Sequence, residues 1–177
     1  SVRSPLLSDV KQTPPKRPPK TLAEAAEQRT PFSGEFEHKI DKQGRVSIPA
    51  RFRNAFSSGI VLSRGFDKCI VGYTLEEWNK VADEISKIPT TSTLGRKVAR
   101  FTFSNAYTLE VDNHGRVLVP NPLRSYAQIK GTCSLIGTGK LLEFWAQELW
   151  VKERVSITKT AEQLNESPNN LAMGGPN

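Results

Sequence analysis

One sequence pattern occurs twice in this chain, and the second copy starts 71 residues after the first. The copies read IDKQGRVSIPARFR at residues 40–53 and VDNHGRVLVPNPLR at residues 111–124. Of the 17 aligned positions that begin at residue 40, six are identical, whereas average composition gives about one match by chance. The chain is therefore predicted to contain two copies of one structural unit, which present their Asp-x-x-Gly-Arg turns as a pair.

The similarity continues beyond the motif when one residue is inserted. Tyr73 and Trp78 lie 72 residues before Trp145 and Trp150, which makes each unit about 70 residues long. A unit of that size buries only a marginal core on its own. We therefore expect the two halves to share one core, or to close it through a partner chain.

Each copy is expected to begin with a half-buried strand, a tight turn and a second strand that folds back as a hairpin. Residues 36–40 alternate between apolar or aromatic and charged side chains, and residues 41–44 carry an Asp and a Gly suited to a turn. Pro49 then ends the sheet pairing and favours the start of a short helix.

The remaining elements are predicted from periodicity and capping. Thr74 and Glu77 form a capping-box pattern, and apolar residues recur every three or four positions up to Ile88, where Pro89 ends the helix. The predicted elements are strands at 36–40, 45–48, 60–62, 69–73, 133–136 and 141–144, and helices at 50–55, 74–88, 94–105 and around Trp150. This pattern indicates an α+β fold with antiparallel strands.

The chain is expected to fall into five segments. These are a basic, Pro-rich flexible extension at 1–31, a first repeat at 32–88, a linking helix at 89–105, a second repeat at 106–154 and a flexible tail at 155–177. The extension has no apolar stretch of the kind found in signal peptides, so secretion is not predicted. A transit peptide and a remnant of cloning are the alternatives for this segment.

The charge and the cysteines limit the class of protein. Of the net charge of +7, +5 falls within residues 32–154, which hold 18 basic and 13 acidic residues; this excess favours nucleic acid or another polyanion as partner, and a merely soluble surface is the alternative. No long apolar run is present, so no membrane span is predicted. Cys69 and Cys133 occupy unrelated places in the two copies, which argues against a disulfide framework or duplicated metal site and fits a reducing cytoplasm.

The two turns are the candidate functional site. Arg45 and Arg116 each follow an aspartate by four residues, and a carboxylate beside a guanidinium orients its donors for a phosphate or for the O6 and N7 edge of guanine. A plain salt-bridged hairpin is the alternative for one such motif, but two copies with further cations nearby favour a binding surface. The candidate DNA-binding residues are Asp41, Lys42, Arg45, Arg51, Arg53, Asp112, His114, Arg116 and Arg124.

Catalysis is not predicted. Asp41 and Asp112 could form an acid dyad across a twofold axis, but each has an arginine nearby that would keep it ionised. No nucleophile arrangement or Gly-rich phosphate loop is present, and His38 and His114 occupy unrelated places. We therefore expect no enzyme activity, cofactor, metal ion or small-molecule substrate.

Several other residues have structural interpretations. Trp78, Trp145 and Trp150 are expected to anchor the core through their large apolar surfaces. Gly65 and Gly137 are expected to permit turns between strands.

The motifs and their surroundings resemble the bacterial MraZ family. The resemblance rests on residues 32–36 followed by the pattern at 41–53, on the second pattern with residues 123–127, and on the segments LSRGFDKC at 62–69 and IGTGK at 136–140. It covers roughly residues 32–154. The long N-terminal extension departs from the family, whose members usually start just before the position of Phe32.

The resemblance implies a double AbrB-like, swapped-hairpin fold with a small barrel-like core and flanking helices. It also implies a ring-shaped homo-oligomer that binds tandem direct repeats of double-stranded promoter DNA, usually as a repressor of a division and cell-wall gene cluster that includes its own gene. A cytoplasmic, nucleoid-associated location accompanies that role. The family's Asp-x-x-x-Arg motifs map onto Asp41 with Arg45 and Asp112 with Arg116, whose arginines are the implied DNA contacts. A structural ring or protein-interaction scaffold without specific DNA readout is the alternative, and an RNA-binding module is a third hypothesis.

Overall fold

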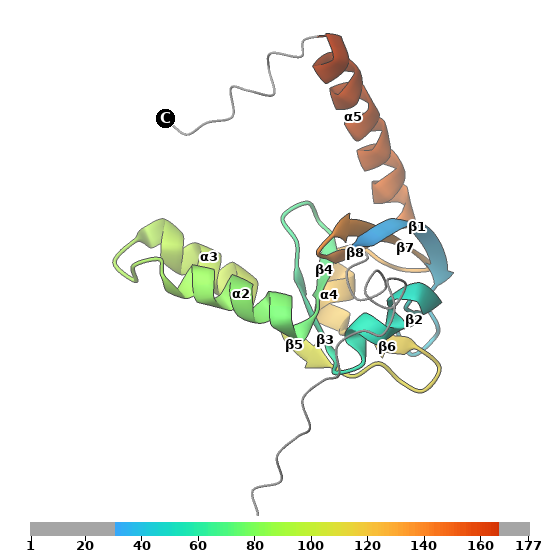
Figure 1. Ribbon diagram of the computed structural model, residues 1–177, viewed down its shortest axis with the longest axis horizontal. Helices are drawn as coiled ribbons and strands as arrows, with labels where there is room; N and C mark the ends of the chain where they lie inside the picture. The colour runs from blue at the N-terminus through green and yellow to red at the C-terminus, as the bar shows by residue number, and fades with distance from the viewer. Residues whose placement is uncertain (1–30, 167–177) are drawn as a thin grey trace, which may run out of the picture. The chain divides into compact units, whose positions relative to one another are not determined.

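The computed structural model describes residues 31–166, so residues 1–30 of the predicted extension and residues 167–177 lie outside the described part (Figure 1). In chain order the elements are β1 (Phe32–Lys39), β2 (Arg45–Ser47), the 3-10 helix η1 (Ala50–Phe56), β3 (Ile60–Arg64), β4 (Ile70–Tyr73), α2 (Leu75–Ser86), α3 (Thr93–Phe103), β5 (Tyr107–Leu109), β6 (Arg116–Leu118), α4 (Asn121–Tyr126), β7 (Thr132–Gly139), β8 (Leu142–Ala146) and α5 (Gln147–Glu166). Strands β5–β8 occupy the places of β1–β4 in the second repeat, and α3 lies between the two sets. The α+β class with antiparallel strands is confirmed.

The main sheet is built by an exchange of strands between the repeats. Its order is β1-β7-β8-β4-β3-β5, and all its pairs are antiparallel. The first strand of each repeat pairs with the third strand of the other, because β1 lies against β7 and β5 lies against β3. Strands β4 and β8 meet in the middle of the order, where Val71 pairs with its repeat equivalent, Glu143. The sheet is therefore symmetric in its topology about the β4–β8 pair.

The turn after β1 forms as predicted, but the strand that follows it has a different partner. The N–H of Gly44 donates to the carbonyl of Asp41 at 2.9 Å, and Gly44 takes a φ of +88°. Strand β2 then pairs with β6 and forms a separate two-stranded sheet. The predicted pairing of residues 45–48 with the preceding strand is therefore wrong. The exchange brings Val46 opposite Val117, and both are fully buried, so this pairing removes two valines from water.

The core draws on both repeats, which confirms the prediction of one shared core. Phe32, Phe52 and Phe56 pack together, with ring centroids 5.1 and 5.2 Å from Phe32, and they join buried residues of the second repeat such as Leu123 and Phe144. The repeats hence stabilise each other through common apolar burial rather than as separate units.

A second apolar cluster lies on the opposite side of the sheet, where side chains of β4, β7 and β8 meet the residue before β4 and one residue of α5. It contains Cys69, Val71, Ile136, Trp145 and Trp150. The predicted core positions of Trp145 and Trp150 are confirmed, because their exposed fractions are 4% and 8%.

Trp78, the repeat equivalent of Trp150, is only half-buried. It contacts the rings of Tyr73 and Phe103 at centroid distances of 5.3 and 5.7 Å. It therefore lies at the contact between β4, α2 and α3 and not in the shared core, so its predicted role as a core anchor is wrong.

Helices α2 and α3 form an antiparallel pair that starts with side-chain caps, as the sequence predicts for α2. The Oγ1 atom of Thr74 accepts the N–H of Glu77 at 3.2 Å, and Oγ of Ser92 accepts the N–H of Gly95 at 3.0 Å. These caps satisfy amide donors at the helix N-termini. No residue of α2 is classed as buried, although the helix has an apolar stripe.

Helix α5 follows directly on β8 and is longer than expected. Residues 155–166, predicted as the start of a flexible tail, belong to this helix. The rest of that predicted tail lies outside the described residues. None of the described helices is long and apolar enough to cross a membrane.

Gly65 and Gly137 have different roles. Gly65 starts the turn between β3 and β4, where its N–H donates to the carbonyl of Cys69 at 2.9 Å, as expected. Gly137 lies within β7 opposite Gly34, so its predicted place in a turn is wrong. A Cβ atom at Gly137 would overlap the backbone nitrogen of Ser33; glycine thus allows β1 to approach β7 closely.

Candidate nucleic-acid interface

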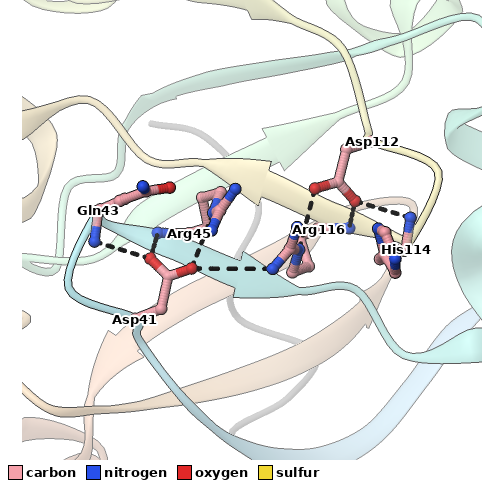
Figure 2. A network of polar contacts seen from close by, with 6 residues as sticks. All are labelled: Asp41, Gln43, Arg45, Asp112, His114 and Arg116. Atoms are coloured by element: carbon pink, nitrogen blue, oxygen red, sulfur yellow. Dashed lines mark hydrogen bonds and ion pairs between the residues drawn. The ribbon is translucent and has the colours of Figure 1, made fainter.

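Each repeat contains the same aspartate-centred turn. Oδ1 of Asp41 accepts the backbone N–H groups of Gln43 and Arg45, both at 2.9 Å, while Oδ2 accepts Nε of Arg45 at 2.7 Å (Figure 2). An aspartate that accepts amides two and four residues ahead locks the turn. It also fixes the guanidinium of the arginine that ends the turn.

The second repeat reproduces this geometry. Oδ1 of Asp112 accepts the N–H groups of His114 and Arg116, both at 2.9 Å, and Oδ2 accepts Nε of Arg116 at 2.9 Å (Figure 2). In both turns the arginine uses Nε within the protein, so the two Nη groups are the donors that remain for a ligand.

The β2–β6 pairing places the two turns at opposite ends of one short ladder, with Arg45 and Arg116 between them (Figure 2). Arg45 pairs with Leu118, and Ser47 pairs with Arg116 in the antiparallel ladder. Nη1 of Arg116 lies 4.0 Å from Oδ2 of Asp41, which belongs to the other repeat. The side chains of Arg45 and Arg116 are 31% and 30% exposed. We call this pair of strands, with its outward side chains Arg45, Ser47, Arg116 and Leu118, the ribbon.

The hydrogen bonds keep both carboxylates ionised. The backbone N–H of Arg45, followed by its guanidinium, lowers the pKa of Asp41 to about 2. The backbone N–H of Arg116 is likewise the main cause of the lowered pKa of Asp112. A carboxyl group held in this way is a poor proton donor or acceptor near neutral pH, which argues against an acid–base role for this pair.

Arg53 and Arg124 brace the turns across the repeat boundary. Nε of Arg53 donates to the carbonyl of Ile48 at 2.9 Å, and Nε of Arg124 donates to that of Val119 at 3.1 Å. Arg53 of the first repeat lies against Gly115 of the second, where a Cβ atom would overlap its Nε.

The reverse contact is also present: Arg124 lies against Gly44, where a Cβ atom would come within 2.8 Å of its Cζ. Both glycines are buried and have positive φ, +75° at Gly115 and +88° at Gly44. Each turn is therefore covered by a guanidinium from the other repeat. The sequence pattern does not predict this cross-bracing. Its one related signal is that the turn glycine and the arginine at the end of the motif have the same sequence spacing in both copies.

The remaining candidate residues surround the turns without a shared network. Lys42 and His114 are exposed within them. Arg51, on η1, contacts the face of Phe52 at 5.2 Å and donates to Oγ of Ser33 at 3.4 Å. The DNA-binding role of all nine candidate residues stays a prediction.

The chemistry that the two turns offer is that of oriented cations. Among residues 31–166, no group of three or more His, Cys, Asp or Glu side chains is placed to hold a metal ion. The arrangement instead offers oriented cationic donors on a two-stranded sheet, which can bind an anionic or guanine-bearing surface.

A family comparison agrees with this geometry. The family model described as "MraZ protein, putative antitoxin-like" matches residues 32–101 and again residues 102–166. The two matches correspond to the two repeats, and together they cover more than half of the chain. This is a family of regulator type. The chain belongs to the MraZ family.

Proposed function

We propose that this chain is a sequence-specific DNA-binding transcriptional regulator that represses a division and cell-wall gene cluster, including its own gene. It acts on nucleoid DNA and engages direct repeats in the promoter as a ring of identical subunits. The observation that carries the proposal is the pair of braced Asp–Arg turns on one ribbon, supported by membership of a regulator-type family.

The ribbon suits duplex DNA in shape and in chemistry. The major groove admits a two-stranded β-ribbon, and arginine is well suited to guanine because its planar donors match O6 and N7. Fixing Nε on an aspartate reduces the side-chain entropy that the arginine loses on binding. Lys42, Arg51 and His114 supplement these contacts at phosphates near the ends of the ribbon.

Exposed apolar surfaces on two separate parts of the chain support assembly. Leu94 and Phe103 of α3 are 71% and 38% exposed, and the groove between α2 and α3 measures about 290 Å³. On α5, Val151 and Val155 are 45% and 51% exposed. Two different apolar surfaces on one chain favour head-to-tail contacts, which close into a ring when the rotation allows. We propose that α5 of one copy docks on the α2–α3 pair of the next.

A ring presents many ribbons at fixed spacing. One ribbon makes few contacts, but several that engage neighbouring boxes raise the affinity through effective concentration. Direct repeats match this arrangement because successive subunits in a ring have the same orientation.

The experiment compares wild type, Arg45→Ala and Arg116→Ala on the duplex upstream of the gene that encodes this chain, beside a scrambled duplex. We expect both variants to lose selective binding, with light scattering showing an unchanged assembly. Lys140→Ala, which removes an exposed cation outside the ribbon, is the matched control and should bind like wild type. The salt dependence of log affinity should flatten by about 0.9 for each phosphate interaction that a substitution removes.

Two results would refute the proposal. Equal binding of wild type to both duplexes would show that the protein does not recognise a specific sequence. An assembly that dissociates in the arginine variants would show that the turns hold subunits together. Either result favours the scaffold hypothesis.

A further inference from the structure

The outward face of the ribbon carries one apolar residue, whose presence on a surface for an anionic ligand is not explained by charge. Val46 and Val117 are fully buried, and side chains alternate between faces along a strand. Residues 45, 47, 116 and 118 therefore point away from the core. Among them Leu118 is an aliphatic side chain that is 52% exposed, and it lies opposite Arg45 on the surface that we propose for DNA.

Leu118 also breaks the symmetry of the ribbon. It is the repeat equivalent of Ser47, because the motifs are 71 residues apart. In the ladder Arg45 lies opposite Leu118, whereas Arg116 lies opposite Ser47. Directly opposite residues in an antiparallel pair have Cβ atoms about 4.5–5.5 Å apart. Two arginines with similar turns thus have different neighbours, one apolar and one a hydroxyl.

In the major groove an exposed aliphatic side chain has one specific partner. The C5-methyl group of thymine is the apolar feature of that groove, while guanine offers the acceptors that arginine binds. A leucine beside an arginine therefore suits a thymine beside a guanine. The serine beside the other arginine offers a donor and an acceptor and no comparable apolar surface.

Building on the proposed function, we propose that Leu118 is a specificity-determining residue that contacts the methyl group of a thymine adjacent to the guanine read by Arg45. Because Ser47 makes no such contact, the two halves of the ribbon read different bases. Each box is therefore non-palindromic and has a direction. A ribbon with exact twofold symmetry would bind a box equally well in both orientations, so the difference between Leu118 and Ser47 is what lets the subunit distinguish the direction of a direct repeat.

The test deletes single methyl groups from the DNA. In the duplex upstream of the gene, each thymine of one box is replaced in turn by deoxyuridine, which lacks only the C5-methyl group. We expect one position at which this change weakens wild-type binding about fourfold, the value for one buried methyl-sized group. Leu118→Ser should bind the thymine and deoxyuridine duplexes equally, and Leu118→Met, which keeps an apolar side chain, should retain the difference.

The outcomes separate this inference from the proposed function. If wild type does not prefer the upstream duplex to a scrambled one, the proposed function fails. If wild type is selective but no thymine is sensitive, or if Leu118→Ser keeps the sensitivity, the role of Leu118 is wrong and the regulator proposal stands. A changed oligomer size of Leu118→Ser in light scattering would assign the side chain to a contact between copies and would also overturn the inference.

Discussion

Asp41 lies within reach of two arginines from different repeats, because its Oδ2 is 2.7 Å from Nε of Arg45 and 4.0 Å from Nη1 of Arg116. Among the described residues no ion pair within 4.0 Å joins Arg45 to Asp112 in return. The two turns are thus similar in their internal bonds but unequal in their link to each other, and Asp41 connects them.

We predict that Asp41→Asn impairs DNA binding more than Asp112→Asn. An amide can replace some hydrogen bonds of the carboxylate but not its charge, so both arginines lose orientation in the first variant and one in the second. The expected loss for Asp41→Asn is at least about fivefold, as for one weakened bidentate base contact. Affinity for the upstream duplex and the melting temperature should fall together. An Asp41→Asn protein with wild-type stability and no DNA binding would contradict a turn-shaping role.

The same carboxylate should make stability depend on acid pH. The pKa of Asp41 falls from its ordinary value of 3.8 to about 2 in the folded protein. Because the folded-state pKa is lowered, the stabilisation is complete above about pH 3.8 and is lost as the pH falls toward 2. The melting temperature of Asp41→Asn should therefore change less than that of wild type between pH 4 and pH 2. Parallel curves for the two proteins in this interval would contradict this assignment.

Cross-bracing predicts that Arg53→Ala loosens the turn of the other repeat. Hydrogen exchange of the amides at 112–116 should become at least about fivefold faster, as expected for the loss of roughly 1 kcal/mol of local interaction. Exchange at 41–45, the turn in its own repeat, should change little. Arg124→Ala should show the reverse pattern.

A glycine variant tests the same contact from the opposite side. Gly115→Ala should disturb residues 112–116 because a Cβ atom would displace Arg53 and because φ is +75°. Gly131→Ala is the matched control, since no atom lies within 4 Å of its Cβ position. For the arginine variants of the preceding paragraph, faster exchange only in the turn of the same repeat as the substituted arginine would show that the bracing does not cross the repeats.

Both thiols should be unreactive in the folded protein. Burial raises the pKa of Cys69 and of Cys133 to about 12, and alkylation requires the thiolate. Mass spectrometry after iodoacetamide at pH 8 should find no labelled cysteine in native protein and two in denatured protein. Rapid labelling of the native protein would contradict the burial of these residues.

The proposed head-to-tail contact predicts complementary defects on two helices. Leu94→Glu on α3 and Val155→Glu on α5 should each dissociate the ring, because each puts a charge into an apolar contact, while both side chains are exposed in the single subunit. An equimolar mixture should form dimers, since each variant retains one intact surface. Light scattering measures this, and full-size rings in either variant alone would exclude its surface from the contact.

The turns and helix caps of this fold can be predicted from the sequence, whereas which strand pairs with which cannot. The turn at Asp41 and the cap at Thr74 depend on residues within four positions of each other, so their side chains are sufficient to indicate them. The predicted partner of β2 is wrong because a tight turn normally joins two strands that pair with each other, whereas here it leads into a strand of a separate sheet. Three residues from one repeat pair with three from another, and no local pattern distinguishes this from pairing with the previous strand.

Other errors have similarly non-local causes. The sequence predicts a turn at Gly137, but its lack of a side chain serves the close approach of β1, about 100 residues earlier. Residues 155–166 are mostly polar and so predict a flexible tail, yet they continue a helix that is anchored at its start by the buried Trp150. For the candidate site, the repeat predicts that the two turns are presented as a pair, and β2 and β6 carry both arginines on one ladder. The contact of Arg53 with Gly115 of the other repeat requires the structure.

The strand exchange has a consequence for the origin and integrity of the molecule. Since β1 completes the second repeat and β5 completes the first, neither half is a finished folding unit, and a single-copy ancestor with this architecture would have existed as an intertwined dimer. Fusion of two such genes would have converted a concentration-dependent association into an intramolecular one. A protease cut in the connection between α2 and α3 should accordingly leave two fragments that stay together until they are denatured.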